Sequence, residues 1–193
     1  MIRQMRANLY HEPIQNRRCR RQPSSRVLQP PTGERHSKAG AIGVSFKQVQ
    51  ISDLPLYNQD DDAGPAASVK RLKDEIKTAQ GLLFVTPEYN RSIPGVLKNA
   101  IDHASRPYGQ NAWKGKPAAV IGASVGVIGT AMAQQHLRNI LAYLDAPTMG
   151  QPEAFIHATD ALFDPAGNIG PGSHKFLQTW MEHYVAWVEK HAA

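Results

Sequence analysis

The chain has 193 residues, of which 41% are hydrophobic and 20% are charged, and its formal net charge is +6. This length predicts one domain with a substantial core. No apolar run reaches the roughly 18 residues of a membrane span, and the first residues lack the apolar stretch of a secretory signal. The single cysteine, Cys19, excludes an internal disulfide framework and offers no zinc-ligand spacing. We therefore expect a reducing, cytoplasmic setting.

The positive charge is confined to the N-terminal quarter. Residues 1–50 contain ten Lys or Arg and two Glu, whereas residues 51–193 contain twelve Lys or Arg and fourteen Asp or Glu. Apolar residues are sparse before Ala41, so residues 1–45 are predicted to be an atypical basic segment with little order, followed by a folded domain over 46–193. The abrupt change of composition is also what a reading-frame shift or a misassigned start would produce.

The folded part opens with a strand over Phe46–Ile51 and a helix over Pro65–Gln80, whose apolar residues recur at helical spacing. The next strand, Gly81–Val85, is short and continuously apolar, as expected for a parallel strand that is buried on both faces. A polar loop, Thr86–Gly95, follows it directly. Pro94 suits the first turn of the next helix, which carries an apolar stripe through Val96, Leu97, Ala100, Ile101 and Ala104.

A second unit of the same design follows. The apolar run Ala118–Ile121 predicts another buried strand, and Gly122–Thr130 is a loop with three glycines, which permit positive φ and close backbone approach. Thr130 is the expected N-cap of a helix whose apolar stripe continues to Leu144. His136 and Arg138 are expected on the surface of this helix or at an interface.

The C-terminal part completes an alternation of strands and helices. Glu153–Ile156 is a weak strand signal, Phe163–Asn168 has turn composition, and a final helix carries Phe176, Leu177, Trp180, Tyr184 and Val188 at helical spacing. The aromatic residues Trp180, Tyr184 and Trp187 are expected to belong to the core and surface of that helix. The alternation predicts an α/β fold with a doubly wound parallel sheet. In such sheets ligands bind beyond the carboxyl ends of the strands, where both loops are placed.

Two motifs carry a resemblance to a known family. The first is Pro87-Glu88-Tyr89-Asn90 with the downstream Ile93–Asp102, and the second runs from Gly122-Ala123-Ser124 through Gly129-Thr130 to Gln134–Arg138. In this order and spacing they resemble the NADPH-dependent FMN reductase family, the flavodoxin-like group that includes chromate and quinone reductases. The resemblance extends from about Phe46 to the C-terminus and implies flavodoxin-like strand order.

The resemblance also implies a cofactor, FMN, with NADPH as a substrate. Carried over residue by residue, it assigns flavin binding to Pro87, Glu88, Tyr89 and Asn90 in the first loop and to Ser124, Gly126 and Gly129 in the second. The alternatives without a role in binding are a solvated carboxylate at Glu88, a turn former at Asn90 and glycines needed only for packing in the second loop. The candidate site contains no catalytic nucleophile–base pair and no metal cluster, so a cofactor is expected to carry the chemistry.

The chain departs from the family at its start. Family members open with a buried strand and a loop that grips the FMN phosphate at a helix N-terminus, whereas here Gly33–Ser37 follows Pro30-Pro31 and is judged a chance match. The first strand and phosphate loop are therefore expected to be missing or replaced, which would leave the sheet without a central member.

Three classes of function are considered. The first is an oxidoreductase that passes electrons from NADPH through FMN to a quinone, metal oxyanion, azo compound or free flavin, in a homodimer or homotetramer as implied by the family. The second is a flavodoxin-type electron carrier or a family member impaired in flavin binding. The third is a nucleic-acid-binding protein acting through the Arg-rich arm, although that arm lacks interleaved aromatic residues and a reading helix.

Overall fold

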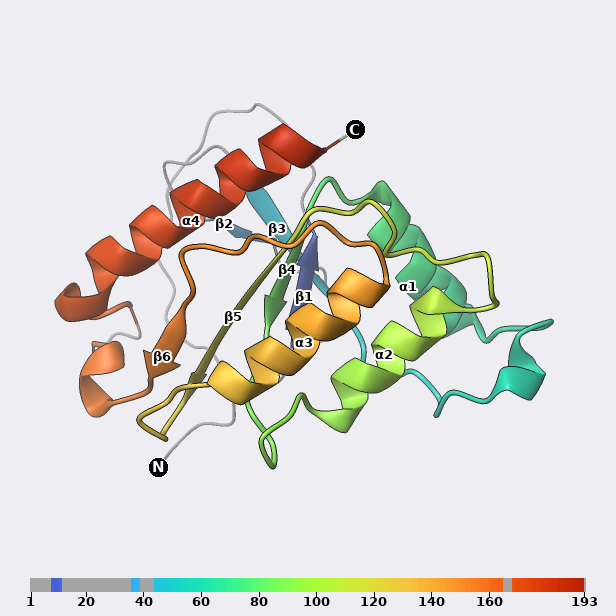
Figure 1. Ribbon diagram of the computed structural model, residues 1–193, viewed down its shortest axis with the longest axis horizontal. Helices are drawn as coiled ribbons and strands as arrows, with labels where there is room; N and C mark the ends of the chain where they lie inside the picture. The colour runs from blue at the N-terminus through green and yellow to red at the C-terminus, as the bar shows by residue number, and fades with distance from the viewer. Residues whose placement is uncertain (1–7, 12–35, 39–43, 165–167, 193) are drawn as a thin grey trace.

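The computed structural model describes residues 8–11, 36–38, 44–164 and 168–192. These residues form a six-stranded sheet in the order β2-β3-β1-β4-β5-β6 with helices on both of its faces (Figure 1). The strands are β1 Asn8–His11, β2 His36–Lys38, β3 Ser45–Val49, β4 Leu82–Val85, β5 Ala118–Ser124 and β6 Phe155–His157. Apart from the extra edge strand β2, this is the flavodoxin-like order that the family resemblance implies.

Strands β3 to β6 run in the same direction, as a doubly wound fold requires. β4 pairs with β5 and β5 with β6 in parallel register, and β3 and β4 are both antiparallel to β1. In β4, Leu82 and Phe84 belong to the core on one face, whereas Leu83 belongs to the core on the other. The apolar residues of this strand are therefore buried on both faces, as the sequence predicts.

The first strand of the sheet is replaced, which is one of the two expected outcomes, but the sheet does not lack a central member. The position predicted to lack a strand is occupied by β1, which lies between β3 and β4 and is antiparallel to both. The parallel first strand of the family is thus replaced by one of opposite direction. Of residues 1–45, only β1, β2 and residues 44 and 45 are described. The predicted disorder of this segment therefore lies outside the described residues. The same is true of Gly33–Ser37, except for its last two residues, which belong to β2.

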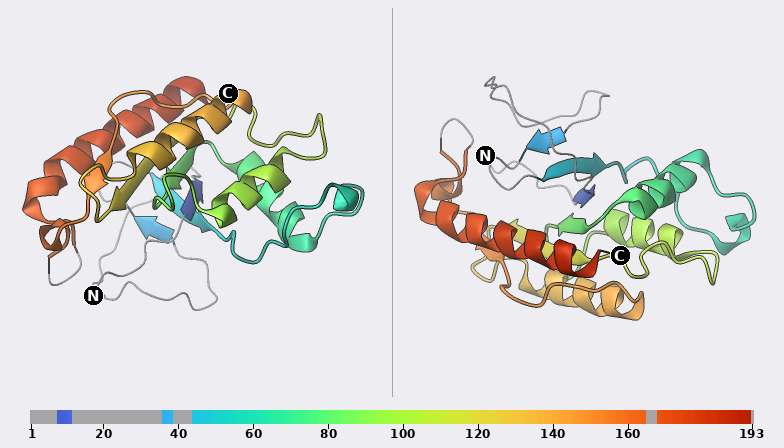
Figure 2. Two further views of the ribbon diagram at one scale, coloured as in Figure 1. Left: turned by 60° about the horizontal axis from the view of Figure 1, so that its bottom comes forward. Right: turned by 90° about the horizontal axis from the view of Figure 1, so that it is seen from above.

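Three helices cover one face of the sheet and one covers the other. Residues of α1 Ala67–Thr78, α2 Gly95–Ser105 and α3 Ala131–Tyr143 pack in one core cluster, and residues of α4 Pro171–His191 pack in the second. Figure 2 shows the strands running between α4 and the α1–α2 pair. Two short 3-10 turns, η1 Gln59–Asp61 and η2 Asp160–Leu162, lie in the connections. Among the described helices, none is long and apolar enough to cross a bilayer.

The expected aromatic core of α4 is confirmed. Trp180 and Tyr184 are buried, and their rings stack with centroids 6.1 Å apart. Tyr184 also stacks on Phe46 of β3. The half-buried Trp187 donates a hydrogen bond from Nε1 to the carbonyl oxygen of Pro147 at 3.2 Å. These side chains attach α4 to the sheet.

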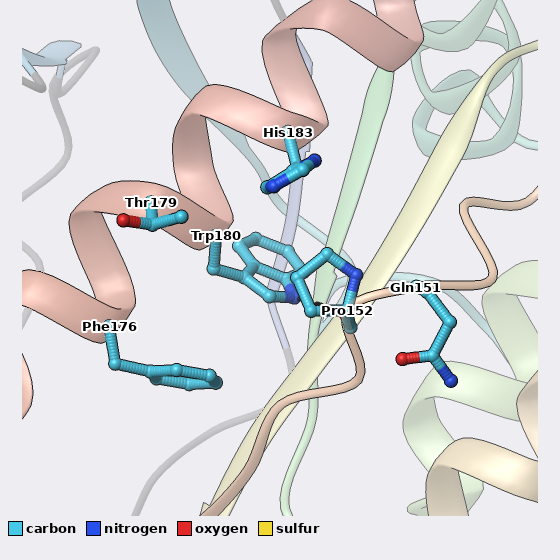
Figure 3. Close-up of a pocket in the computed structure, with 6 residues that line it drawn as sticks. All are labelled: Gln151, Pro152, Phe176, Thr179, Trp180 and His183. Carbon is cyan, nitrogen blue, oxygen red and sulfur yellow. Dashed lines mark hydrogen bonds between the residues drawn. The ribbon is translucent and has the colours of Figure 1, made fainter.

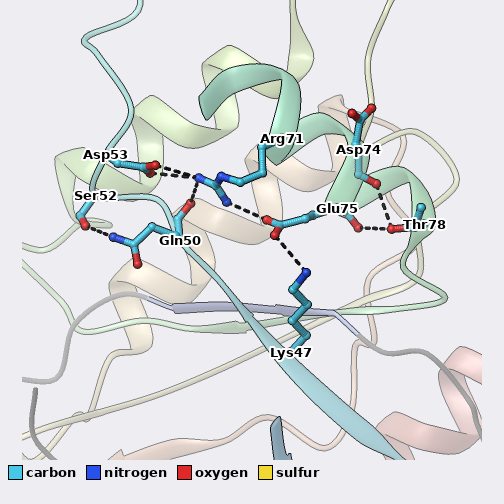
Figure 4. Close-up of polar contacts among 8 residues, drawn as sticks. All are labelled: Lys47, Gln50, Ser52, Asp53, Arg71, Asp74, Glu75 and Thr78. Carbon is cyan, nitrogen blue, oxygen red and sulfur yellow. Dashed lines mark hydrogen bonds and ion pairs between the residues drawn. The ribbon is translucent and has the colours of Figure 1, made fainter. Parts of the chain in front are cut away.

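A polar cluster fixes the point where the chain leaves β3 (Figure 4). Arg71 of α1 donates to the carbonyl oxygen of Gln50 at 2.8 Å, to both carboxylate oxygens of Asp53 and to Glu75 at 2.8 Å. Glu75 also pairs with Lys47 of β3 at 3.3 Å. Because one guanidinium joins the turn at 50–53 to the helix that follows it, the cluster sets the angle between β3 and α1.

Candidate functional site

Both sequence-predicted loops lie at the same edge of the sheet. Residues 86–94 follow the end of β4, residues 125–130 follow the end of β5, and both loops lie at the lower edge in Figure 1. The two strands pair in parallel with Val85 opposite Ile121, and the Thr86 amide extends the pairing by donating to the Ile121 carbonyl oxygen at 3.0 Å. Adjacent carboxyl ends therefore bring together two motifs that are more than 30 residues apart.

The first loop ends in a tight turn that displays Asn90. Tyr89 and Ser92 exchange backbone hydrogen bonds of 2.9 and 3.0 Å, and the two residues between them have positive φ angles, 51° at Asn90 and 65° at Arg91. Asn tolerates this left-handed conformation better than most residues. Within the described part of the chain the Asn90 side-chain amide has no hydrogen-bond partner, so its donor and acceptor remain available to a ligand.

Glu88 connects the first loop to the helix that follows the second. Its Oε2 accepts hydrogen bonds from the amides of Met132 at 3.0 Å and Ala133 at 3.1 Å, in the first turn of α3. Its side chain is only 10% exposed. A carboxylate at this position satisfies two free N–H groups and complements the positive end of the helix dipole. Glu88 is therefore not a solvated loop carboxylate, which was the alternative to a role in binding.

This arrangement corrects the expected capping of α3. Thr130 occupies the N-cap position, as predicted, but its side chain makes no capping hydrogen bond. Its Oγ1 instead accepts from Nε2 of the buried Gln134 at 2.9 Å. The capping group comes from Glu88, 44 residues earlier.

The second loop is closed by its own serine. Ser124 Oγ donates to the carbonyl oxygen of Gly129 at 2.6 Å and accepts from the amide of Gly126 at 3.2 Å. Gly129 has a φ of +60°, and a Cβ there would lie 2.8 Å from the carbonyl carbon of Phe155, so no larger residue fits without backbone movement. A Cβ at Gly126 would meet only Ser124 Oγ, at 3.5 Å. Gly129 is thus a packing glycine, whereas the fold does not require one at Gly126.

Gly122, in β5, is a further position where the backbone is closely packed, and the sequence analysis did not assign it to the site. A Cβ at Gly122 would lie 2.2 Å from the carbonyl oxygen of Thr86 and 2.3 Å from Oγ1 of Thr130. The position therefore allows the end of β4 and the start of α3 to meet over β5. Its only sequence signal was its place as the first glycine of the second loop.

The rim of the two loops is apolar and exposed. The exposed fractions are 51% for Tyr89, 55% for Val125, 83% for Val127 and 47% for Ile128. Exposed large apolar side chains on neighbouring loops favour binding of an apolar partner. The sequence analysis singled out Tyr89 and the small residues here, but it did not predict a role for Val125, Val127 or Ile128.

A cavity of about 450 Å³ lies beside the first loop, lined by Ser92, Ile93, Gly95, Lys98, His136, Asn139 and Ile140. Nδ1 of His136 lies 3.0 Å from Ser92 Oγ, so this exposed histidine also joins α3 to the first loop. Arg138 was expected on the helix surface or at an interface, and its side chain is only 15% exposed. It donates to the carbonyl oxygen of Met149 at 2.6 Å, and burial lowers the pKa of its guanidinium while the carboxylate of Glu153 opposes that shift.

A second cavity, of about 350 Å³, is unrelated to the loops. Figure 3 shows it between α4, which supplies Phe176, Thr179, Trp180 and His183, and the connection that supplies Gln151 and Pro152. The Trp180 indole donates to the Pro152 carbonyl oxygen at 2.8 Å. Neither the loop at 86–94 nor the loop at 125–130 contributes to its lining.

Comparison with known proteins identifies relatives over most of the chain. The family model described as NADPH-dependent FMN reductase matches residues 32–160. A 2-hydroxy-1,4-benzoquinone reductase of a Burkholderia species is 55% identical over 145 residues, which are 75% of this chain and 79% of the relative. A quinone reductase of Pseudomonas putida is 46% identical over 158 residues, 81% of this chain and 85% of that protein.

A solved structure agrees with these relatives. FerB of Paracoccus denitrificans, described as a flavoenzyme NAD(P)H:(acceptor) oxidoreductase, is 50% identical and superposes with a TM-score of 0.72. The alignment covers 75% of this chain and 80% of FerB.

Proposed function

Because the chain belongs to the NADPH-dependent FMN reductase family, we propose that it is a flavin-dependent oxidoreductase that passes electrons from NAD(P)H to a quinone. The choice of a quinone among possible acceptors is supported by the names of two relatives, at 55% and 46% identity. The observation that carries the proposal is the pairing of the two loops at the carboxyl ends of β4 and β5, joined by Glu88.

The described residues fit the flavin ring. FMN, when bound at these loops, would supply the redox chemistry that side chains lack, namely uptake of a hydride from NAD(P)H and two-electron reduction of a quinone to its hydroquinone. We assign Asn90, with its unpartnered amide, to hydrogen bonds with the polar edge of the ring and the exposed Tyr89 to packing beside it. Pro87 and Glu88 hold the first loop in place, and Ser124, Gly126 and Gly129 shape the second.

The apolar rim has a role in the second half of the reaction. A quinone is a flat, mostly apolar molecule, so exposed Val125, Val127 and Ile128 offer it contact area without specific hydrogen bonds. Few specific contacts are consistent with an acceptor that is recognised by shape and apolarity. A substrate-sized apolar rim beside the loops is expected of a reductase and disfavours a role as a carrier without a substrate.

The experiment is steady-state NAD(P)H oxidation by FMN-loaded protein with a benzoquinone as acceptor, for the original chain and Asn90→Gly. Glycine keeps the left-handed turn but removes the amide, so flavin affinity should fall about tenfold to a hundredfold, or about 1–3 kcal/mol. Asp145→Gly is a matched control, because Asp145 also has a positive φ, of 59°, but follows the far end of α3.

The outcomes separate the parts of the proposal. No quinone-dependent oxidation of NAD(P)H would contradict the activity. If Asn90→Gly retained flavin and turned over as the original chain does, the role given to Asn90 would be wrong, while the activity itself would stand.

We also propose that the chain forms a homodimer or homotetramer. Val96 on α2 is 40% exposed, and Met132 and Tyr143 on α3 are 41% and 80% exposed. Such apolar side chains on the outer helices favour association with a second copy. Light scattering should give a molar mass that is a multiple of the mass of one chain, and the mass of a single chain would refute this assembly.

A further inference from the structure

The direction of the central strand bears on how this site holds a flavin. Asn8 lies opposite Val85, and His11 lies opposite Leu82. The first residue of β1 therefore lies at the edge of the sheet that carries the two loops. The chain leaves β1 after His11 at the opposite edge.

This direction removes the usual position of a phosphate site. In open α/β sheets of this order, a bound phosphate lies at the N-terminus of a helix that follows a central strand from its carboxyl end. Here the central strand presents its amino end to the ligand edge. The connection that follows β1 therefore does not begin beside the two loops.

The N-terminus of α3, the helix that follows the second loop, is also occupied. In α3, the amides of Met132 and Ala133 already bind the Glu88 carboxylate. A dianionic phosphate placed there would compete with this carboxylate and be repelled by it.

Among the residues that the structure describes, one exposed cation, Arg91, lies in the first loop. Arg91 is 71% exposed, with Glu88 Oε1 at 3.9 Å, whereas Lys98 is engaged by Asp102 at 2.6 Å. A single exposed ion pair changes an affinity by about fivefold at most. Among the described residues at this edge, Arg91 alone therefore cannot replace a built phosphate site.

The remaining contacts suit the uncharged part of a flavin. Tyr89, Val125 and Ile128 are each about half exposed beside the loops, and the Asn90 amide is unpartnered. Apolar contact and amide hydrogen bonds recognise an isoalloxazine ring whether or not its side chain ends in phosphate.

We propose that this site recognises a flavin by its ring, with little contribution from the phosphate, and that riboflavin binds within tenfold of FMN. This inference rests on the proposed function, because it concerns the same site.

The test is a titration of the full chain with FMN and with riboflavin at one ionic strength, followed by flavin fluorescence. We expect dissociation constants that differ by less than tenfold. A preference for FMN of tenfold or more would overturn the inference but leave the proposed function intact. If neither flavin binds, the proposed function fails together with the inference.

Two variants, with Tyr108→Ala as a control, show whether both flavins use the loops and whether Arg91 holds the phosphate. Tyr89→Ala removes an exposed ring and should weaken both flavins by a similar factor, whereas Tyr108→Ala, which is 89% exposed beyond the far end of α2, should change neither. Arg91→Gln should lower FMN affinity by less than about fivefold. Two results would overturn the inference. One is that Tyr89→Ala weakens FMN binding but leaves riboflavin binding unchanged. The other is that Arg91→Gln lowers FMN affinity tenfold.

Discussion

The carboxylate of Glu88 binds the amide of Met132 across 3.0 Å, although the two residues belong to different strand–loop–helix units. The side chain of Glu88, in the loop of the first strand–loop–helix unit, thus caps α3, the helix of the second unit. Because the contact joins the loop after β4 to the start of α3, each loop depends on the other for its position. A change that moves one loop should therefore also move the other.

Glu88→Ala should destabilise the protein and not only weaken its flavin binding. Loss of a capping carboxylate leaves two N–H groups unsatisfied and costs about 1–2 kcal/mol, which lowers Tm by about 2–8 °C. Glu88→Gln keeps one acceptor oxygen and should have a smaller effect. Glu189→Ala, at an exposed position of α4, is the control and should stay within about 0.5 kcal/mol. An unchanged Tm in Glu88→Ala would show that the capping contact is unimportant.

Two glycines of the same loop should differ in their tolerance of alanine. Gly129→Ala forces a Cβ to within 2.8 Å of backbone at a φ of +60° and should cost at least about 2 kcal/mol. Gly126→Ala meets no such obstacle and should change the free energy of unfolding by less than about 0.5 kcal/mol. Urea unfolding measures both values. If Gly126→Ala weakens flavin binding at unchanged stability, close approach of the ligand explains that glycine.

Arg71→Gln should loosen the turn that leaves β3. The guanidinium is about one-third exposed, so the loss should be about 1 kcal/mol and should shrink in 1 M salt. Lys70→Gln is the adjacent control, since Lys70 is exposed. Equal thermal shifts for the two variants, or a shift for Arg71→Gln that salt leaves unchanged, would contradict the role given to the cluster in Figure 4.

Removal of residues 1–43 should impair solubility, contrary to what the composition of that segment indicates. The deletion takes away β1 and leaves the facing edges of β3 and β4 unpaired in the middle of the sheet. Unpaired strand edges promote association. Light scattering should therefore detect aggregates, whereas removal of residues 1–7 alone, which keeps β1, should not produce them. A soluble, monodisperse chain lacking residues 1–43 would mean that β1 is dispensable.

The sequence by itself determined the alternation of strands and helices from Phe46 onward and the positions of the two loops. These features follow from local properties: apolar periodicity marks β4, β5 and the helices, and Pro and Gly mark where they end. The family motifs added the flavin and the strand order. The boundaries of the described elements accordingly lie within a few residues of those predicted.

Only the tertiary structure decided the rest, because the remaining features depend on residues that are distant in the chain. The cap on α3 comes from Glu88, 44 residues before it, so the local N-cap signal of Thr130 was misleading. The need for glycine at 129 arises from the backbone of Phe155. The reversed direction of β1 is seen only in its pairing with β3 and β4, because a four-residue segment is too short to carry a periodicity from which pairing could be predicted.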